Sequence, residues 1–376
     1  MNQKVLIFTK KVLPNSNTFV AVQTKNTPNF QPVYIGFKET KSAKELIGDA
    51  QTCIQDQHEN LAGLKKLFLE CFCYLSKGWF TALKSNQAAL IHAHFGKGGF
   101  YCLPIARQLK LPLIVTFHGS DITQKDKLSY SQKHRSEVFK HADKIIAVSK
   151  FIEKKLLESN CPAEKIVQLY TGIDTTFFTP SEQKSEKPTV MFLGRLIKQK
   201  GCDFLIKAMK KVTKHVPNVE LVIVGEGVER QALEKQAANM SNIKFVGEKN
   251  STQVKQYLDR AWLMCAPSIV RKRGNEEGLG SVFLEAQAMK TPVISFNTGG
   301  VAEAVLMNKT GLVLNDINSD ALANALIELI KNNALREKFK TAGRKHIVNN
   351  FNVIKQGHKL SELYQETISL AHKTGT

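Results

Sequence analysis

Short apolar runs alternate with longer amphipathic stretches along almost the whole chain. The runs fall at residues 5–8, 33–36, 89–93, 113–117, 144–148 and 166–169 in the first half, and at residues 190–193, 220–224, 243–246, 262–266, 292–296 and 311–314 in the second. Strands that alternate with helices form right-handed βαβ units, in which the strands lie parallel. The pattern therefore predicts an α/β fold with two parallel sheets.

A polar stretch separates the two blocks of predicted strands. Residues 179–188 are rich in Pro, Ser, Glu and Lys, a composition that is typical of a linker. A chain of 376 residues suits two domains of ordinary size. We expect one Rossmann-like domain over residues 1–178 and a second over residues 189–352, facing each other across a cleft. A last helix follows the second block.

Composition is that of a globular protein. Charged residues make up 23% of the chain and hydrophobic residues 43%. No apolar run reaches the length of about 18 residues that spans a membrane, and the N-terminus reads as a strand rather than a signal peptide. The seven cysteines lack metal-binding spacing and are expected to be reduced thiols in a cytosol.

The net charge of +20 is high and evenly spread. Lys and Arg minus Asp and Glu give 24 − 14 = +10 through Pro180 and 29 − 19 = +10 after it. Nucleic acid, an anionic lipid surface or solubility could each explain such a charge. No aromatic stacking platform or nucleic-acid motif accompanies the lysines, so nucleic acid is not an expected partner.

The segment 271–303 carries the clearest chemical signal. Glu277 ends a loop after a predicted strand, residues 278–280 lead into a predicted helix, and Glu285 lies on that helix. In parallel α/β sheets, ligands bind at such strand ends, facing a helix N-terminus. Glycines let a phosphate approach backbone N–H groups, and carboxylates accept hydrogen bonds from sugar hydroxyls. The segment predicts a site for an anionic ligand rich in hydroxyls, such as a nucleotide-sugar.

A second cluster indicates the same kind of ligand. Residues 189–193 form a short apolar strand, and Arg195 and Lys200 flank the turn that follows it. Arginine presents a planar fork to diphosphate oxygens, and lysine adds a point charge. Two solvated cations in a lysine-rich chain are the alternative interpretation. Their position after a strand and upstream of the acidic segment favours diphosphate binding.

These segments resemble a known family. FLGRLIKQKG, LVIVGEG, FVGE and EGLGSVFLEAQA occur in this order and resemble the donor half of a retaining glycosyltransferase of family 4, with the GT-B fold, over most of residues 188–305. The E-x7-E formed by Glu277 and Glu285 is the most specific part. In the first half SNTF, HAHFGKGG, TFHGSD and YTGID resemble the polysaccharide-assembly branch, the colanic acid and amylovoran type. Together the resemblance covers roughly residues 1–350.

The resemblance implies a hexosyltransferase. Its donor would be a nucleoside diphosphate sugar, most simply UDP-linked, and its acceptor a lipid-linked saccharide for surface polysaccharide. The first domain would bind the acceptor, residues 189–352 the donor, and a helix within residues 353–376 would pack back on the first domain. No cofactor and no metal are expected, because the chain lacks the D-x-D of metal-dependent glycosyltransferases. The expected location is the cytoplasm, peripherally at the inner face of the plasma membrane.

Two further kinds of function stay open. A nucleotide-sugar epimerase or a sugar phosphorylase can share this fold; an epimerase would convert the donor without an acceptor, and a phosphorylase needs a cofactor-lysine context that we do not find. A basic nucleic-acid-binding protein would explain the charge alone.

Roles follow for the donor half. Breaking the bond between sugar and diphosphate places negative charge on the departing phosphate, which fixed positive charge stabilises. We assign Arg195 and Lys200 to this diphosphate. By resemblance, Glu285 holds the ribose hydroxyls and Glu277 holds hydroxyls of the transferred sugar. Further donor contacts are expected at Gly225, Val246, Gly278, Leu279, Gly280, Ser281 and Val282.

In the first domain, His118 follows the predicted strand 113–117. The resemblance implies that His118 reaches the transferred sugar at the reaction centre, although a lone strand-end histidine is often structural. Candidate acceptor contacts are Ser16, Thr18, His94 and Asp121. His92 and His94 alternate on one strand and so face the same side. A metal site with His118 is conceivable, but no carboxylate or cysteine completes a ligand set.

The segment 61–84 allows two interpretations. It carries Leu, Phe, Tyr and Trp around much of a helix, with Lys residues between them. It is either a buried helix of the first domain or a basic amphipathic surface that docks on an anionic membrane leaflet. Its Glu and Cys residues favour the buried helix.

Overall fold

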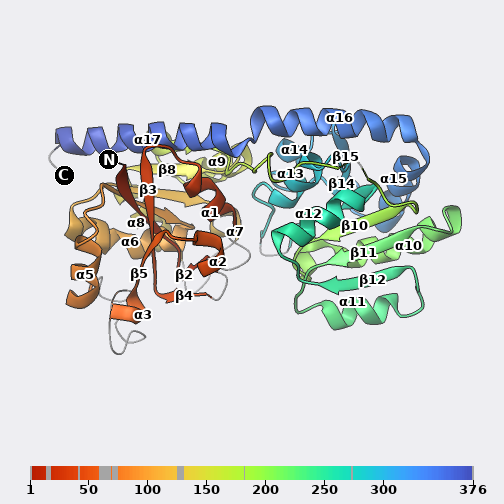
Figure 1. The fold of residues 1–376 in the computed structure, drawn as a ribbon, viewed down its shortest axis with the longest axis horizontal. Coiled ribbons are helices and arrows are strands. Elements are labelled where there is room, and N and C mark those ends of the chain that lie inside the picture. The colour runs from red at the N-terminus through yellow and green to blue at the C-terminus, as the bar shows by residue number, and fades with distance from the viewer. Residues whose placement is uncertain are drawn as a thin grey trace. The chain divides into compact units, whose positions relative to one another are not determined.

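A computed structural model describes residues 2–13, 18–40, 43–58, 69, 75–124, 131–181, 183–271 and 274–374. The chain divides into two compact units (Figure 1). Unit 1 comprises Met1–Gly172 and Val353–Thr376, and unit 2 comprises Ile173–Asn352. Ser16 and most of segment 61–74 lie outside the described residues.

Unit 1 is built on a seven-stranded sheet in the order β5-β3-β1-β6-β7-β8-β9, with every neighbouring pair parallel. The strands are β1 (Gln3–Phe8), β3 (Phe30–Gly36), β5 (Gln51–Ile54), β6 (Leu90–His94), β7 (Leu113–Phe117), β8 (Lys144–Ala147) and β9 (Ile166–Gln168). Strand order reverses between β1 and β6, which makes a topological switch point. β6 and β7 are buried along their whole length, because helices cover both faces of the sheet.

Alternate residues of β1 enter two different cores. Leu6 and Phe8 join the core on one face, whereas Val5 and Ile7 join the core on the other. The helices are α1 (Thr18–Lys25), α2 (Ala43–Ile47), α3 (Gln55–His58), α5 (Lys77–Lys84), α6 (Gly96–Leu109), α7 (Ser120–Thr123), α8 (Gln132–His141), α9 (Lys150–Glu158) and the last helix α17 (Val353–Thr374). A short two-stranded ladder joins β2 (Lys11–Val12) to β4 (Lys38–Glu39).

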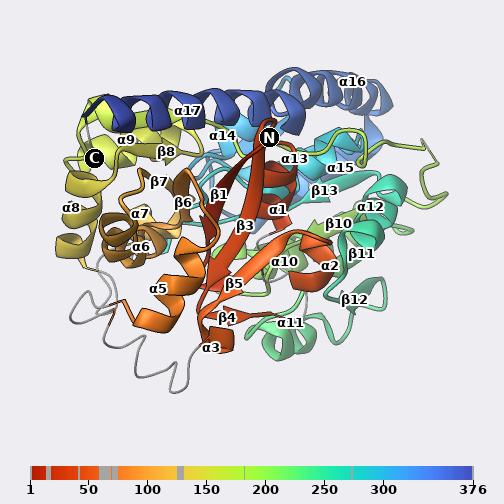
Figure 2. The same ribbon diagram turned by 60° about the vertical axis from the view of Figure 1, so that its left-hand side comes forward.

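Helix α17 lies along unit 1 (Figure 2). Leu360, Leu363 and Tyr364 enter the same core as Val5 and Ile7. The last helix therefore packs on the first unit, as the resemblance implies.

Unit 2 contains a six-stranded parallel sheet in the order β12-β11-β10-β13-β14-β15, which reverses between β10 and β13. Its strands are β10 (Thr189–Leu193), β11 (Glu220–Val224), β12 (Ile243–Gly247), β13 (Leu263–Cys265), β14 (Val293–Phe296) and β15 (Gly311–Leu314). Its helices are the 3-10 helix η3 (Lys198–Lys200), α10 (Cys202–His215), α11 (Arg230–Ala237), α12 (Ser251–Arg260), α13 (Ser281–Ala288), α14 (Val301–Ala304), α15 (Ser319–Lys331) and α16 (Asn333–Asn350). The predicted α/β fold with two parallel sheets is confirmed.

Helix α10 illustrates why these sequences form helices. Leu205, Met209 and Val212 recur at helical spacing and are fully buried in the core of unit 2. Asp203 lies in the first turn and Lys214 in the last, where each charge complements the helix dipole. Helix α10 packs on the sheet of unit 2, and its N-terminus lies at the carboxyl ends of the strands.

The division between the units falls after Gly172, earlier than the expected boundary at 178. Ile173 donates its backbone N–H to Phe351 O, and the Arg344 guanidinium donates to Thr175 O and Phe178 O. These contacts attach residues 173–178 to unit 2. Polar composition does not reveal them, because Arg344 comes from a helix far along the chain.

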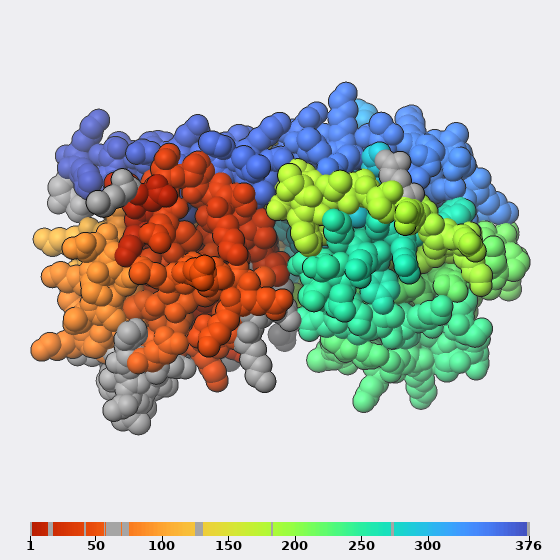
Figure 3. Space-filling model, viewed as in Figure 1, coloured from red at the N-terminus to blue at the C-terminus, as the bar shows by residue number. Residues whose placement is uncertain are grey.

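The expected linker 179–188 also packs on unit 2 where it is described. Ser181 donates its backbone N–H to Asp259, and the Trp262 indole donates to Ser185 O at 2.7 Å. Figure 3 shows this yellow-green stretch on the surface of unit 2. The Lys184 ammonium also donates to Leu258 O and to the Thr291 hydroxyl, so a polar composition is a poor guide to the order of this stretch.

The described part of segment 61–84 packs its apolar side chains into the core of unit 1. Leu69 and Leu75 are buried, and Trp79 is fully buried with its indole donating to Cys53 O. Lys77 and Lys84 are exposed on α5. No helix among the described residues is long and apolar enough to cross a membrane.

Candidate active site

The carboxyl edge of the unit 2 sheet is built from loops that lie backbone against backbone. Gly194 follows β10 and donates to Val224 O, and Gly225 follows β11 and donates to Gly247 O. A Cβ atom on Gly225 would lie only 2.0 Å from Gly194 O. Only glycine fits there, so the residue predicted as a donor contact also sets the spacing between two loops.

Lys200 and Glu277 form a salt bridge at this edge, although 77 residues separate them. Their side chains are only 16% and 15% exposed. Ser268 donates its hydroxyl to Glu277 Oε2 at 3.2 Å. The fold therefore brings together two residues that the sequence assigned separately to one ligand.

Glu277 is held as a carboxylate. Burial raises its pKa, but the charge and hydrogen bond of Lys200, the Ser268 hydroxyl and the charge of Arg195 together bring the pKa below its usual value. Arg195 is itself exposed. Its effect on Glu277 indicates that the guanidinium contributes to the same electrostatic site.

The start of α13 completes the site in unit 2. Gly280 precedes this helix with φ 81°, and a Cβ there would lie 2.5 Å from the Phe283 ring. Gly300 donates its N–H to Glu277 O at 2.9 Å, which fixes the loop that contains Glu277, Gly278 and Leu279. The first N–H groups of a helix have no acceptor within the helix and attract anions. Those of Ser281 and Val282 belong to this set.

Glu285 lies on the second turn of α13 and is half-buried. Burial raises its pKa to about 7, so the carboxyl changes protonation near neutrality. Val246, the remaining predicted donor contact, lies half-buried in β12. Both roles stay predictions.

In unit 1, His118 directly follows β7 and is half-buried. His118 Nε2 lies 3.0 Å from His94 Nδ1, and the two rings stack with centroids 5.3 Å apart. Phe19 and Phe95 also contact the His118 ring. Burial lowers the pKa of His94 to about 3, and burial with the neighbouring His94 lowers that of His118 well below its usual value. Both imidazoles are therefore neutral.

Asp121 holds the loop that carries His118. Its carboxylate accepts N–H groups from Gly96 at 3.0 Å, His118 at 3.1 Å and Gly119 at 2.8 Å. Burial raises the pKa of Asp121, and these hydrogen bonds partly offset that rise. Asp121 thus orients His118 through the backbone, and an acceptor contact by Asp121 stays a prediction.

The other acceptor candidates are less informative. Thr18 begins α1 and is half-buried, His94 is only 1% exposed, and Ser16 is outside the described residues. Among the residues that the structure describes, no three His, Cys, Asp or Glu side chains gather where they could hold a metal ion.

Sequence reasoning missed two residues at these edges. Ser268 hydrogen-bonds Glu277, and Tyr364 of α17 hydrogen-bonds His92. Neither lies in a motif. A serine just after a strand and a tyrosine in the last helix carry no distinguishing local signal, so only the fold could find them.

Comparison with known proteins decides the family. The model of glycosyl transferases group 1 matches residues 174–346, and that of Glycosyltransferase Family 4 matches residues 68–177. A mannosyltransferase of Corynebacterium glutamicum, described as GDP-mannose-dependent and acting on a monoacylated phosphatidylinositol monomannoside, is 30% identical over 67% of this chain and 70% of its own length. The chain belongs to glycosyltransferase family 4.

Other relatives agree with the polysaccharide branch of this family. The amylovoran biosynthesis glycosyltransferase AmsK of Erwinia amylovora is 27% identical over 75% of this chain and 71% of its own length. The putative colanic acid biosynthesis glycosyltransferase WcaL of Salmonella typhimurium is 28% identical over 73% and 69%. This protein is a hexosyltransferase.

Solved structures establish its fold as GT-B. Anabaena Alr3699/HepE, in complex with UDP and glucose, superposes with a TM-score of 0.77 at 18% identity, over 97% of this chain and all of HepE. A glycosyltransferase from Rickettsia africae gives the same TM-score at 21% identity, covering 98% and 99%.

Proposed function

We propose that this family 4 glycosyltransferase transfers a hexosyl unit, with retention of configuration, from a UDP-sugar to a lipid-linked saccharide during surface polysaccharide synthesis. The observation that carries the proposal is the half-buried Lys200–Glu277 pair, which lies beside Arg195 and the loop before α13. Two cations, a carboxylate and a helix N-terminus match a diphosphate attached to a sugar.

Arg195 and Lys200 take the two phosphates of the donor. As the bond from the sugar anomeric carbon to the β-phosphate oxygen breaks, negative charge grows on that oxygen, and the two cations stabilise it. The N–H groups at the start of α13 add further positive potential. Lys200 already neutralises Glu277 before a ligand binds, so the approaching diphosphate does not meet an uncompensated carboxylate.

The carboxylates take the hydroxyl groups of the donor. Glu277 is ionised and accepts hydrogen bonds from hydroxyls of the transferred sugar. Glu285, on the second turn of α13, holds the ribose. His118 is neutral and offers the transferred sugar a hydrogen bond without adding charge at the reaction centre.

In the retaining reaction that we propose, the acceptor hydroxyl attacks the face of the sugar from which the diphosphate departs. The new bond joins the acceptor oxygen to the anomeric carbon, and the departing β-phosphate takes the acceptor proton. No protein nucleophile is required. We propose no metal for this step.

Different relatives support the proposed donor and the proposed acceptor. HepE was solved with UDP and glucose, which favours UDP, whereas the Corynebacterium relative is described as GDP-mannose-dependent. AmsK and WcaL are named for polysaccharide biosynthesis, which favours a saccharide acceptor. The net charge of +20 favours binding of the protein to an anionic membrane surface.

Thermal stabilisation by UDP-, GDP- and ADP-sugars tests the donor. A donor at about 100 times its Kd stabilises the folded protein by about 2.7 kcal/mol. We expect the largest shift with a UDP-sugar. A larger shift with a GDP-sugar would overturn the UDP assignment, and no shift with any of them would overturn the donor site.

Arg195→Ala and Glu285→Ala are expected to abolish transfer to a lipid extract while the fold is retained. Lys198→Ala is the matched control, because Lys198 lies in the same turn but is exposed and pairs with Glu229. Near-normal turnover in both site variants would reject the site.

A further inference from the structure

Tyr364 links the last helix to the histidines of unit 1. Its hydroxyl lies 2.6 Å from His92 Nδ1, and His92 Nε2 lies 2.6 Å from the Thr116 hydroxyl. All three side chains are at most 2% exposed. The His92 ring is thus held at both nitrogens by groups from two other elements, α17 and β7.

The contacts continue from His92 to His118. The His92 and His94 rings lie 4.4 Å apart, tilted by 32°, and His94 then contacts His118. β6 and β7 present these residues on one face, and each β6 histidine reaches the β7 residue two places beyond its register partner. We call Tyr364, His92, His94 and His118 the histidine column.

His94 depends on its neighbours for its orientation. Its second ring nitrogen, Nε2, is buried and has no hydrogen-bond partner among the described residues. Its other ring nitrogen, Nδ1, lies 3.0 Å from His118 Nε2. The His94 ring is therefore positioned by the His92 ring and by His118, and a change in His92 is transmitted to His118.

The protonation states of Tyr364 and His92 decide which group donates and which accepts each hydrogen bond. Burial, with His94 and His118 nearby, lowers the pKa of His92, so its ring is neutral with one N–H. Burial raises the pKa of Tyr364, so its phenol keeps its proton. If the phenol donates to Nδ1, then His92 carries its proton on Nε2 and donates to Thr116. We infer this arrangement, in which the hydrogen bond from the Tyr364 hydroxyl selects the Nε2–H tautomer of His92.

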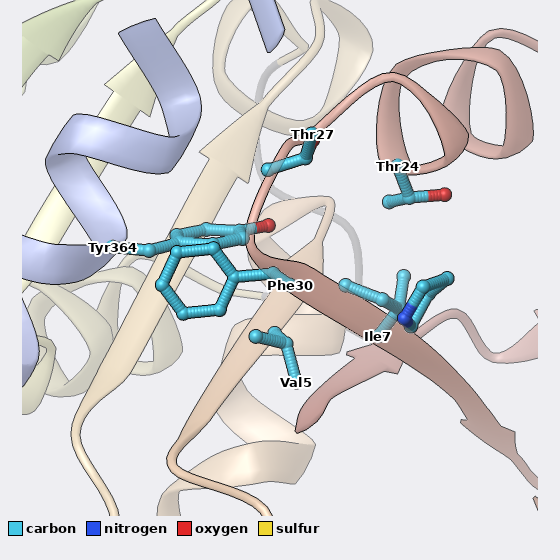
Figure 4. A pocket seen from close by; sticks show the side chains of 7 residues that line it. Val5, Ile7, Thr24, Thr27, Phe30 and Tyr364 are labelled. Atoms are coloured by element: carbon cyan, nitrogen blue, oxygen red, sulfur yellow. The ribbon is translucent and has the colours of Figure 1, made fainter. Parts of the chain in front are cut away.

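The Tyr364 ring lies in the core of unit 1 that also contains Val5 and Ile7. A small hollow borders its ring, lined also by Val5, Ile7, Thr24, Thr27, Phe30 and Pro32 (Figure 4). The Phe30 ring contacts Tyr364 edge-on at 5.1 Å. The Tyr364 ring is thus held by this edge contact and by the hydrogen bond to His92.

We propose that Tyr364 is a positioning residue for His118 and acts through His92 and His94. This inference rests on the proposed function, in which His118 contacts the transferred sugar. It gives the last helix a part in the chemistry of the first unit in addition to its packing.

Tyr364→Phe tests the proposal, with Tyr34→Phe as the matched control. Tyr34 is also fully buried in the same core, and its hydroxyl contacts Thr24 at 2.6 Å rather than a histidine. Each variant removes one buried hydroxyl and keeps the ring. We expect kcat to fall about tenfold in Tyr364→Phe, with the KM for donor nearly unchanged, and to stay near normal in Tyr34→Phe. Equal kcat losses in both would overturn the proposal.

Imidazole nitrogen NMR gives a readout that needs no activity. We expect Tyr364→Phe to change the tautomer of His92 and to shift the ring nitrogen signals of His94 and His118, whereas Tyr34→Phe leaves them in place. Unchanged His94 and His118 signals in Tyr364→Phe would overturn the column. If the unaltered protein transfers no sugar, the proposed function fails while the NMR result still decides the coupling.

Discussion

The carboxyl edges of the two sheets differ in charge: the edge in unit 2 carries charged side chains, and the edge in unit 1 carries neutral ones. Each presents polar side chains at the carboxyl edge of a parallel sheet, beside a reversal of strand order. In unit 2 these are charged, with Lys200 paired to Glu277 and Arg195 nearby. In unit 1 they are histidines that burial keeps neutral. The difference indicates that unit 2 is suited to an anion, whereas unit 1 is suited to uncharged hydroxyl groups.

Removal of the Lys200 charge is expected to have the largest effect on the site in unit 2. Lys200→Ala takes away the main stabilising partner of the Glu277 carboxylate and one of the two charges that we propose for the diphosphate. We expect kcat to fall by a factor of about 100 to 1000, the usual effect of losing a group that stabilises transition-state charge. Initial rates of sugar transfer measure it, with Lys198→Ala remaining near normal. A Lys200→Ala variant that kept more than about a tenth of the turnover would mean that unit 2 does not act through its charge.

The loops that support this charge are the next target. Gly225→Ala places a Cβ against Gly194 O, so the two loops must separate. We expect a loss of about 3 kcal/mol in the free energy of unfolding and weaker donor binding. Gly48→Ala is the control, because Gly48 also has positive φ but has open space around it; its cost is expected near 1 kcal/mol. Urea unfolding compares them, and equal losses would remove the steric argument.

The stability of the protein is expected to depend on pH through Glu285 of unit 2. Glu285 has its pKa raised to about 7 in the folded protein, against an ordinary value of 4.5. Between these values the folded state holds a proton that the unfolded state has lost. Its contribution to stability is therefore complete below about pH 4.5 and falls as the pH rises through 7, by at most about 1.4 kcal/mol per pH unit.

Glu285→Gln should remove that part of the pH dependence. Urea unfolding at several pH values, with and without the substitution, measures it. Identical slopes in the two proteins would show that Glu285 does not titrate in this range.

The smallest expected effect is an absence of titration in unit 1. His94 has its pKa lowered to about 3 by burial, so its ring stays neutral between pH 5 and 8. Its ring nitrogen NMR signals should not move over this range. A His94 transition near pH 6 would mean that the histidine column carries charge, and the contrast between the units would fail.

Much of the architecture was predictable because apolar runs mark buried parallel strands. The runs at 113–117 and 220–224 coincide with β7 and β11. β5 (Gln51–Ile54) escaped, because its first two residues are polar and its apolar part is short. The boundary after Gly172 also escaped, because it depends on Arg344 reaching back to residues 173–178.

For the candidate site, the sequence indicates single residues, whereas only the structure shows the contacts between them. Lys200 and Glu277 were each assigned to the donor from local motifs, but their salt bridge was not foreseen. The FHGSD segment indicates His118, but only the structure shows its contact with His94 and the hydrogen bonds by which Asp121 holds its loop. Tyr364 had no motif at all. Contacts between residues far apart in sequence leave no mark that a single chain can display.

The sequence by itself determined the strand–helix alternation, the glycines where loops approach, and the charged residue types at the strand ends. Tertiary structure alone decided which of those charges meet and which side chains carry a proton. The reason is that protonation depends on burial and on neighbours in space: Glu277 stays ionised beside Lys200, Glu285 titrates near 7 without such a partner, and His94 is neutral because it is enclosed.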